Sequence, residues 1–142
     1  MRKLMVFILI FYTSTILAQS PPVNSLKDFQ WKNRILLLNI PGDPRKTVEE
    51  LMKLGPQFAE RNLVWFVFSN GNIETNFPGT ISDSFASGIP KQYFKGKKAE
   101  VALVGKDGEV KYRAPSFSAN DIFSRIDSMP MRREEIKNTK PR

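Results

Sequence analysis

Two runs, the nearly continuous apolar stretch Ile35–Ile40 and the continuous one Leu63–Phe68, place the strongest limit on the fold of this chain. A strand with one face in water alternates apolar and polar residues, whereas a continuous run is typical of a strand covered on both faces. Between the two runs, residues 48–59 repeat apolar side chains at helical spacing. The segment therefore predicts a right-handed strand–helix–strand unit whose two strands are parallel.

The start and the end of this crossover helix carry their own signals. Asp43 before Pro44 fits a helix start with proline in the first turn. A second start signal, Thr47-Val48-Glu49-Glu50, has the pattern of a capping box. Pro56 cannot donate to the carbonyl of Met52, so we expect a kink or a break there.

The second half of the chain predicts a hairpin followed by a helix. Val101–Val104 and Val110–Arg113 flank a turn centred on Asp107-Gly108, which makes the last two strands antiparallel. Ser118 can cap a final helix, and Met129-Pro130 ends its first part. This element order is that of a thioredoxin-like α/β fold, with a central mixed sheet of four to five strands flanked by helices.

The segment Ser69–Lys98 gives the weakest pattern. It is rich in turn-forming residues, and only Ile89–Phe94 suggests a helical turn. A structureless stretch of this length is unusual in a compact domain, so we expect a functional or mobile insertion.

The N-terminus reads as a secretory signal peptide over residues 1–18. Arg2 and Lys3 precede an apolar centre, Leu4–Tyr12, and a tolerable cleavage site lies before Gln19. The alternative, an uncleaved membrane helix, needs about 20 apolar residues, more than this stretch contains. The prediction is an exported protein, periplasmic or secreted, with no membrane span after cleavage. We expect a linker over residues 19–25, one monomeric or weakly associated domain over 26–136, and a basic tail over 137–142.

The chain contains no cysteine and no histidine. Thiol–disulfide exchange, peroxidase chemistry through a thiol, and Ser-His-Asp or Cys-His catalysis are therefore excluded. The commonest metal ligands are missing as well, and Asp107 and Glu109 lack the spacing of a calcium loop. We predict no catalytic residue, no metal site and no cofactor.

Four stretches together resemble one known family: "WKNRILLLNIPGDP", "ERNLVWFVF", "VALVGKDGEVKYR" and "FSRIDSMPMRREE". They are similar to the bacterial domain of unknown function that is grouped with the animal Drs/Urb/Equarin proteins. The resemblance covers roughly residues 26–136 and is most specific in "LVGKDG" and "IDSMPMRR". It implies a thioredoxin-like fold related to peroxiredoxins without the redox cysteine pair. It also implies export, since the animal proteins are secreted and matrix-associated. No activity is established for the family, so the resemblance supplies no catalytic residue.

The corner "NIPGDPRKT" occupies the place where a thioredoxin carries its reactive dithiol, at the N-terminus of the first helix. Asp43 could act as an acid–base group or, as we favour, help to cap the helix. We predict a partner surface at this edge of the sheet, formed by Asp43, Arg45, Lys46, Lys97 and Lys98. Its cations indicate a partner with negative charge, either an acidic protein or an anionic envelope or matrix component. Nucleic acid is not expected, because an exported protein rarely meets it.

A rival surface is the stretch "SMPMRREE". Met129, Met131, Arg132 and Arg133 could form a docking surface of adaptable methionines and bidentate arginines. In the other interpretation the methionines fill the edge of the core at a helix bend, and the arginines pair locally with Glu134 and Glu135.

These features favour a non-redox binding or interaction domain. The alternatives are a carboxylate-dependent enzyme and a structural envelope or matrix-associated protein. An enzyme of that kind needs two carboxylates facing each other across a cleft, and the sequence pattern supplies no such pair.

Overall fold

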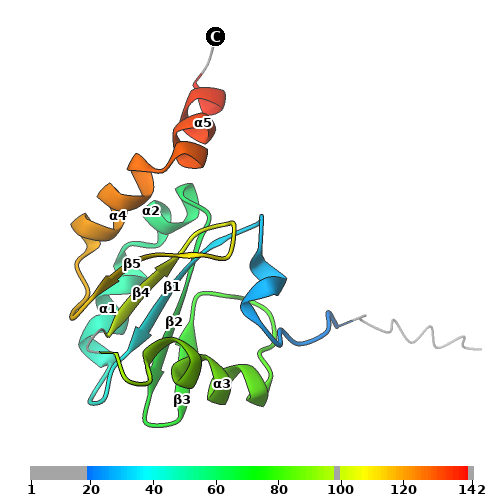
Figure 1. Ribbon diagram of the computed structural model, residues 1–142, viewed down its shortest axis with the longest axis vertical. Coiled ribbons are helices and arrows are strands. Elements are labelled where there is room, and N and C mark those ends of the chain that lie inside the picture. The colour runs from blue at the N-terminus through cyan, green and yellow to red at the C-terminus, as the bar shows by residue number, and fades with distance from the viewer. Residues whose placement is uncertain (1–18, 98–99, 141–142) are drawn as a thin grey trace, which may run out of the picture.

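The structure, a computed structural model, describes residues 19–97 and 100–140. Its centre is a five-stranded sheet in the order β3-β2-β1-β4-β5 (Figure 1). The parallel pair β1–β2 and the antiparallel pair β4–β5 confirm the predicted pairings, and β1–β4 and β2–β3 are antiparallel too. The strands are β1 (Arg34–Asn39), β2 (Leu63–Ser69), β3 (Asn72–Thr75), β4 (Val101–Val104) and β5 (Val110–Ala114).

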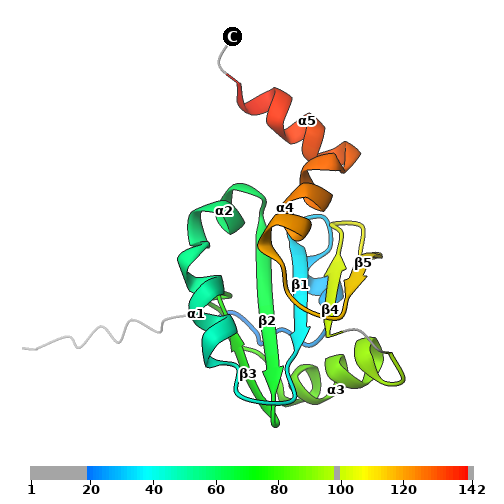
Figure 2. The ribbon, with the colours of Figure 1, turned by 90° about the vertical axis from the view of Figure 1, so that its left-hand side faces the viewer.

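Helices cover both faces of the sheet (Figures 1 and 2). One face carries α1 (Arg45–Lys53), α2 (Gly55–Glu60) and α4 (Ala119–Ser128), and the other carries the 3-10 helix η1 (Leu26–Phe29) and α3 (Asp83–Phe94). The last helix, α5 (Pro130–Thr139), extends beyond the end of the sheet that lies opposite the start of α1 (Figure 1). The order β2-β1-β4-β5, with α1 as crossover and α4 after the hairpin, makes the fold thioredoxin-like, as predicted.

The central strands explain why the sequence reads as continuous apolar runs. In β1, Leu36 and Leu38 face the α1 side, whereas Ile35 and Leu37 face the α3 side, and all four are buried. Burying a side chain of this size stabilises the fold by about 1.5–3 kcal/mol. The sheet therefore lies between two apolar layers, and the polar residues of β1 and β2 are confined to the ends of these strands, at Arg34, Asn39 and Ser69.

The helix boundaries follow proline and capping chemistry. α1 ends at Lys53 and α2 begins at Gly55, with Pro56 in its first turn, which confirms the predicted break. α1 begins at Arg45, whose N–H donates to Asp43 Oδ1 over 3.1 Å. The second predicted start signal is wrong, because Thr47 lies inside the helix. Ser118 caps α4, and Pro130 separates α4 from α5, as expected.

The prediction that Ser69–Lys98 is irregular is wrong in its first part, which forms an extra edge strand. Asn70 and Gly71, with φ of 49° and 80°, make a two-residue turn that returns the chain along β2 as β3. Positive φ at both central residues identifies a type I′ turn, the turn that joins twisted antiparallel strands best. The Asn-Gly dipeptide is the sequence signal of such a hairpin.

In the second part the predicted helical turn at Ile89–Phe94 is confirmed, but the prediction missed that it belongs to a longer helix, α3, which runs for 12 residues. Ser82 caps it by accepting a hydrogen bond from the N–H of Phe85 over 3.2 Å. Phe85, Ile89 and Phe94 are buried against the sheet, and this burial outweighs the low helix propensity of a glycine and a proline inside the helix.

Both ends of the domain are more ordered than the sequence predicted. Val23, placed in the linker, is buried, and its N–H donates to the carbonyl of Thr80 over 2.9 Å. α5 continues to Thr139, past the predicted boundary at residue 136. Trp31, shortly before β1, is 65% exposed. The predicted signal peptide lies outside the described residues.

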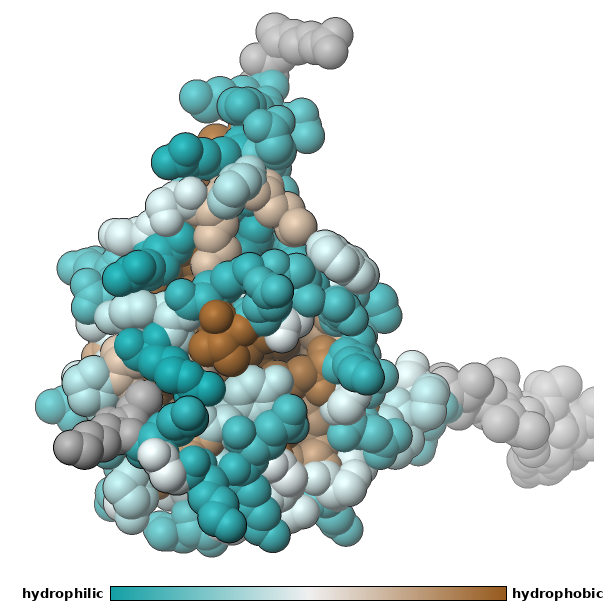
Figure 3. All heavy atoms as spheres, in the orientation of Figure 1, coloured by the Kyte–Doolittle hydropathy of each residue, from teal (hydrophilic) through white to brown (hydrophobic). Residues whose placement is uncertain are grey.

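The outer surface on the α3 side is mostly hydrophilic, with small separate apolar areas near its middle, and α5 is covered by hydrophilic residues (Figure 3). Within residues 19–97 and 100–140, no helix combines the length and the apolar character needed to cross a membrane.

Candidate functional site

The corner after β1 is held at the sheet edge by a side-chain contact to β2. The hydroxyl of Ser69 donates to the carbonyl of Gly42 over 2.7 Å. Next to it, Arg45 donates to the carboxylate of Asp43 from Nε at 2.8 Å and from a terminal nitrogen at 2.6 Å. Both side chains are exposed, so this pair lies in water.

The pair at the corner sets the charge state of its own members. The hydrogen bonds from Arg45 lower the pKa of the Asp43 carboxyl, and the same contact raises the pKa of Arg45. A carboxyl with a lowered pKa is a poor proton carrier near neutral pH. Asp43 therefore acts as a local partner of the helix start and of Arg45, which is the interpretation that the sequence favoured.

A pocket of about 260 Å³ opens beside the corner. Lys46 and Glu50 of α1 line it together with Glu100, which precedes β4. The N–H of Asn39, at the end of β1, donates to the carbonyl of Glu100 over 2.8 Å. This bond joins the end of β1 to the segment before β4. The fold thus places a lysine and two glutamates, distant in sequence, around one small pocket.

The other predicted lysines lie on the connection between α3 and β4. Lys95 and Lys97 are exposed there, and Lys91 is exposed in the last turn of α3. Within the described residues none of these three takes part in an ion pair. Lys98 lies outside the described residues. The structure therefore places Lys46 and Lys97 at the same edge of the sheet. Among the described residues of this predicted surface, only Asp43 and Arg45 form an ion pair with each other.

The rival surface is divided between the interior and the exterior. Arg132 is only 5% exposed and donates to Glu60 Oε1 over 2.8 Å and to Asp127 Oδ1 over 3.3 Å. Of the two interpretations of this stretch, Arg132 does not fit the docking surface, because α2 and α4 already occupy its guanidinium. It fits the local pairing better, although its shortest contacts are to Glu60 and Asp127 and Glu135 lies at 3.8 Å. Arg133 is exposed, Met131 is 41% exposed, and Met129 packs against the core.

Arg132 belongs to a larger ion-pair network, here called the basal cluster, which joins α2, α4, α5, β1 and the β4–β5 turn. Arg34, 1% exposed, donates to both carboxylate oxygens of Glu135, over 3.1 and 3.2 Å. Lys106 donates to the same carboxylate over 2.6 Å. The members of the basal cluster are Arg34, Glu60, Arg61, Lys106, Asp127, Arg132 and Glu135.

The basal cluster shifts the pKa values of its two central acids. Partial burial by itself raises the pKa of Glu135, but the hydrogen bonds from Arg34 and Lys106 outweigh this effect, and the net pKa is lowered. For Asp127 the same opposition holds, and the hydrogen bonds from Arg61 and Arg132 leave its pKa lowered as well. Sequence reasoning missed Arg34, which lies directly before the first predicted apolar run. An arginine at the start of a buried run is the signal that could have indicated a buried partner.

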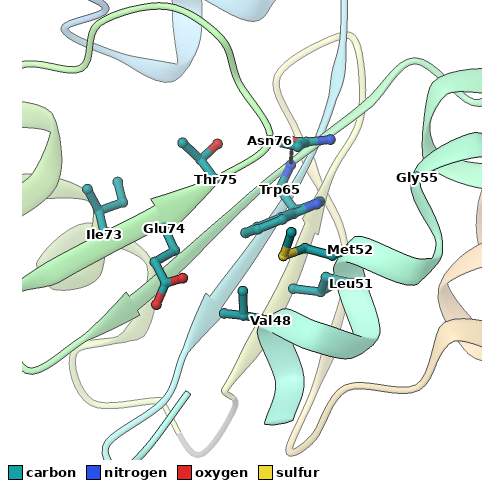
Figure 4. Close-up of a pocket in the computed structure, with 9 residues that line it drawn as sticks. All are labelled: Val48, Leu51, Met52, Gly55, Trp65, Ile73, Glu74, Thr75 and Asn76. Atoms are coloured by element: carbon teal, nitrogen blue, oxygen red, sulfur yellow. Dashed lines mark hydrogen bonds between the residues drawn. The ribbon is translucent and has the colours of Figure 1, made fainter. Parts of the chain in front are cut away.

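A second cavity, a groove of about 530 Å³, lies between α1 and β3 (Figure 4). Val48, Leu51 and Met52 of α1 form one wall, and Trp65 of β2 and Glu74 of β3 point into the same space. Met52 is 69% exposed at the rim. The sequence could not predict this groove, because the strand that forms its outer wall was not foreseen.

The groove ends at a side chain that takes the place of a strand. The N–H of Trp65 donates to Asn76 Oδ1 over 2.8 Å, and Asn76 Nδ2 donates to the carbonyl of Leu63 over 3.3 Å. The side chain of Asn76 thus provides hydrogen-bond partners for the backbone of β2 at Leu63 and Trp65, beyond the end of β3. No cluster of three or more metal-ligating side chains occurs in the described part of the chain. These sites present exposed lysines at one edge of the sheet and an apolar groove with one acid at the other.

Comparisons with known proteins give a family and one similar structure. Among curated proteins, no sequence matches this chain. One similar solved structure is described as that of the mitochondrial 2-Cys peroxiredoxin from Plasmodium falciparum, with a TM-score of 0.47 and 16% sequence identity. The similarity covers 80% of this chain and 83% of the peroxiredoxin chain. The model of a family described as "Domain of unknown function (DUF4174)" matches residues 25–135. This cysteine-free, thioredoxin-like chain belongs to the DUF4174 family.

Proposed function

We propose that this chain is an exported, non-redox interaction module that binds an acidic protein at the sheet edge formed by the corner loop and the α3–β4 connection. The observation that carries the proposal is the set of exposed lysines at this edge. Lys46, Lys91, Lys95 and Lys97 are exposed, and none has a carboxylate within ion-pair distance among the described residues.

The position of these lysines supports a binding role. Ligands of open α/β sheets gather beyond the carboxyl ends of the parallel strands, and the corner loop follows the carboxyl end of β1. Unpaired exposed cations attract an acidic surface and speed up its association. Elsewhere on the chain the arginines are mostly occupied, as Arg34, Arg61 and Arg132 are in the basal cluster.

Export rests on the N-terminal sequence and on the family resemblance. Arg2 and Lys3 followed by an apolar stretch form a secretory signal, and their removal lowers the formal net charge from +8 to +6. The similarity to the Drs/Urb/Equarin group, whose animal members are secreted and matrix-associated, supports the same location. N-terminal sequencing of the protein from its native host should begin at Gln19, and a chain that still begins at Met1 would contradict export by cleavage.

The binding proposal is tested by capture of partners in the exported fraction of the host. Capture by the unchanged protein is compared with capture by the double variant Lys97→Ala, Lys98→Ala. The control is Lys137→Ala with Lys140→Ala, which removes the same charge from α5. We expect the first variant to lose most of the captured acidic protein and the control to retain it.

The same experiment at rising salt concentration separates charge from shape. Exposed charges are screened within about 10 Å at 0.1 M salt, so the capture should weaken as salt rises. Capture that ignores salt and both lysine pairs would overturn the proposal. Binding only to phosphatidylglycerol vesicles or heparin would replace the acidic protein by an anionic envelope or matrix component.

A second candidate, carboxylate chemistry, is favoured by one observation, the pocket that Glu50 and Glu100 line with Lys46. A pair of carboxylates across a pocket is the arrangement that acid–base hydrolysis needs. Both glutamates are exposed, however, and an active site usually excludes water from such groups. Hydrolysis of a panel of glycoside and ester substrates that disappears in Glu50→Gln and Glu100→Gln would establish this function in place of the binding module.

A further inference from the structure

We propose that the free edge of β3 binds an extended polypeptide segment that carries a lysine or arginine between two apolar residues. The segment would pair antiparallel with β3 and place its cation beside Glu74 at the mouth of the α1–β3 groove. This inference concerns a different surface and the opposite partner charge, and so it goes beyond the proposed function.

β3 presents unpaired backbone groups at its outer side. It is the strand at one edge of the sheet, and Ser69 and Asn72 are the paired residues on either side of the hairpin turn. In an antiparallel ladder alternate residues turn their N–H and C=O toward the partner strand. Asn72 and Glu74 therefore bond to β2, whereas Ile73 and Thr75 turn their backbone groups outward. Among the described residues, no backbone hydrogen bond reaches Ile73 or Thr75 from outside the sheet.

The bonding of β2 confirms this assignment of sides. Phe68 accepts from the N–H of Ile40 on the β1 side, and Trp65 donates to Asn76 on the β3 side. The odd-numbered residues of β2 thus turn their backbone N–H and C=O groups toward β3. Val67 and Ser69 are the β2 residues that pair with Glu74 and Asn72, as the register requires.

The groove gives this edge a recognition surface that an ordinary edge strand lacks. Glu74 points to the α1 side of the sheet, whereas Ile73 and Thr75 point to the other side (Figure 4). Glu74 is also the only charged side chain that lines the groove in the described part of the chain. Met52, exposed at the rim, is an adaptable apolar contact for a side chain that enters from the edge.

Charge complementarity selects the occupant. A residue opposite Glu74 forms a non-hydrogen-bonded pair, in which the Cα atoms are about 4.5 Å apart and the side chains meet closely. Opposite charges stabilise such a pair and like charges destabilise it. A lysine or arginine fits there, and its two neighbours turn toward Ile73 and Thr75 on the other face, where apolar residues fit. Strand addition of this kind is an established mode of peptide recognition.

The same argument disfavours a second copy of the chain as the occupant. Two antiparallel β3 strands satisfy all their outward N–H and C=O groups in one register. In that register Ile73 of each copy lies opposite Thr75 of the other. That register places the two Glu74 carboxylates directly opposite each other, which is destabilising.

The test uses the full-length mature protein and the peptide acetyl-Ser-Thr-Val-Lys-Val-Thr-Ser-amide, titrated by NMR. We expect saturable shifts and slowed amide exchange at Ile73 and Thr75. A peptide with glutamate in place of lysine should bind about fivefold more weakly, as expected for a reversed cross-strand charge pair. A peptide methylated on both valine nitrogens should not bind, because it has lost the donors that pair with β3.

Two protein variants make the test specific. Glu74→Lys should reverse the preference, so that the glutamate peptide binds more tightly than the lysine peptide. Glu49→Lys, the same charge change at an exposed position of α1, should leave the preference as it was. The double change Lys97→Ala, Lys98→Ala should not affect the peptide, which keeps this outcome separate from that of the proposed function. Absence of saturable binding, equal binding of both peptides, no effect of Glu74→Lys, or a dimer with protected Ile73 and Thr75 in the absence of peptide would each overturn the proposal.

Discussion

At the start of β1, Arg34 lies in the interior and donates to both carboxylate oxygens of Glu135 over 3.1 and 3.2 Å. Past the end of the same strand, Arg45 forms a shorter pair with Asp43 in water, over 2.8 and 2.6 Å. Three helices, α2, α4 and α5, contribute to the network around the first pair. The second pair joins the corner loop to the first residue of α1, and both of its side chains are exposed. Breaking a buried pair costs about 3–5 kcal/mol, whereas exposed pairs contribute about 0–1 kcal/mol.

The difference teaches how to separate structural charges from binding charges in this chain. "DPRKT" and "PMRREE" look equally polar in the sequence. At the Arg34 end most of the charges pair with one another and join α5 to the start of β1. At the other end the lysines have no ion-pair partner among the described residues, and this is the edge where we propose that a partner binds.

The largest expected effect is that of Arg34→Met. The change leaves the partly buried Glu135 with Lys106 at 2.6 Å and the more distant Arg132 at 3.8 Å, and it removes the donor to the carbonyl of Arg61. The free energy of unfolding, measured by urea denaturation, should fall by about 3–5 kcal/mol. A loss below about 1 kcal/mol would mean that the buried end of β1 is no more important for stability than the exposed one.

A matched pair of neighbouring arginines sharpens the comparison next. Arg132→Met removes hydrogen bonds to Glu60 and Asp127 and should cost about 1.5–3 kcal/mol. Arg133→Met removes an exposed charge of the same size and should change stability by less than about 0.5 kcal/mol. Equal effects of the two changes would show that burial does not distinguish them.

Acid should weaken the basal cluster and leave the lysines of the exposed edge charged. The folded-state pKa values of Glu135 and Asp127 are lowered from ordinary values of 4.5 and 3.8. A lowered pKa contributes stability that is present above the unfolded value and is lost as the pH falls through the folded value. The melting temperature should therefore decline as the pH falls below about 4.5, the ordinary value for Glu135. Glu135→Gln should start lower at pH 7 and decline less steeply, and an identical slope would contradict a role of this carboxylate.

The smallest effect on stability is expected at the exposed pair. Asp43→Asn leaves Arg45 without its partner, but both side chains are exposed, so the melting temperature should stay within the error of the measurement. Capture of an acidic partner should increase, because one more cation at the corner becomes available. A lower melting temperature together with unchanged capture would place this pair among the structural charges.

Much of the fold follows from local pattern. The two apolar runs fixed the buried strands, Pro56 and Pro130 fixed two helix breaks, and the pairing of the strands agrees with the predicted order. The hairpin at Asn70-Gly71 was available in the same way, but the short polar strand after it carries too little apolar pattern to be predicted. The sequence did not predict the full length of α3, because it contains a glycine and a proline, which lower helix propensity locally. The burial of its apolar face against the sheet offsets this loss, and that contact is not visible in the local sequence.

The sequence by itself determined the chemistry that this protein lacks and the frame on which its surfaces are built. Without cysteine or histidine, no arrangement in space can supply a thiol or an imidazole. Tertiary structure alone decided which charges are free, because Arg132 and Arg133 are identical in kind and adjacent in sequence, yet one meets Glu60 and Asp127 and the other meets water. Tertiary structure also formed the α1–β3 groove. Which side chains line it depends on the packing of α1 against the sheet and on the position of β3 at its edge, and a local stretch of sequence does not determine either.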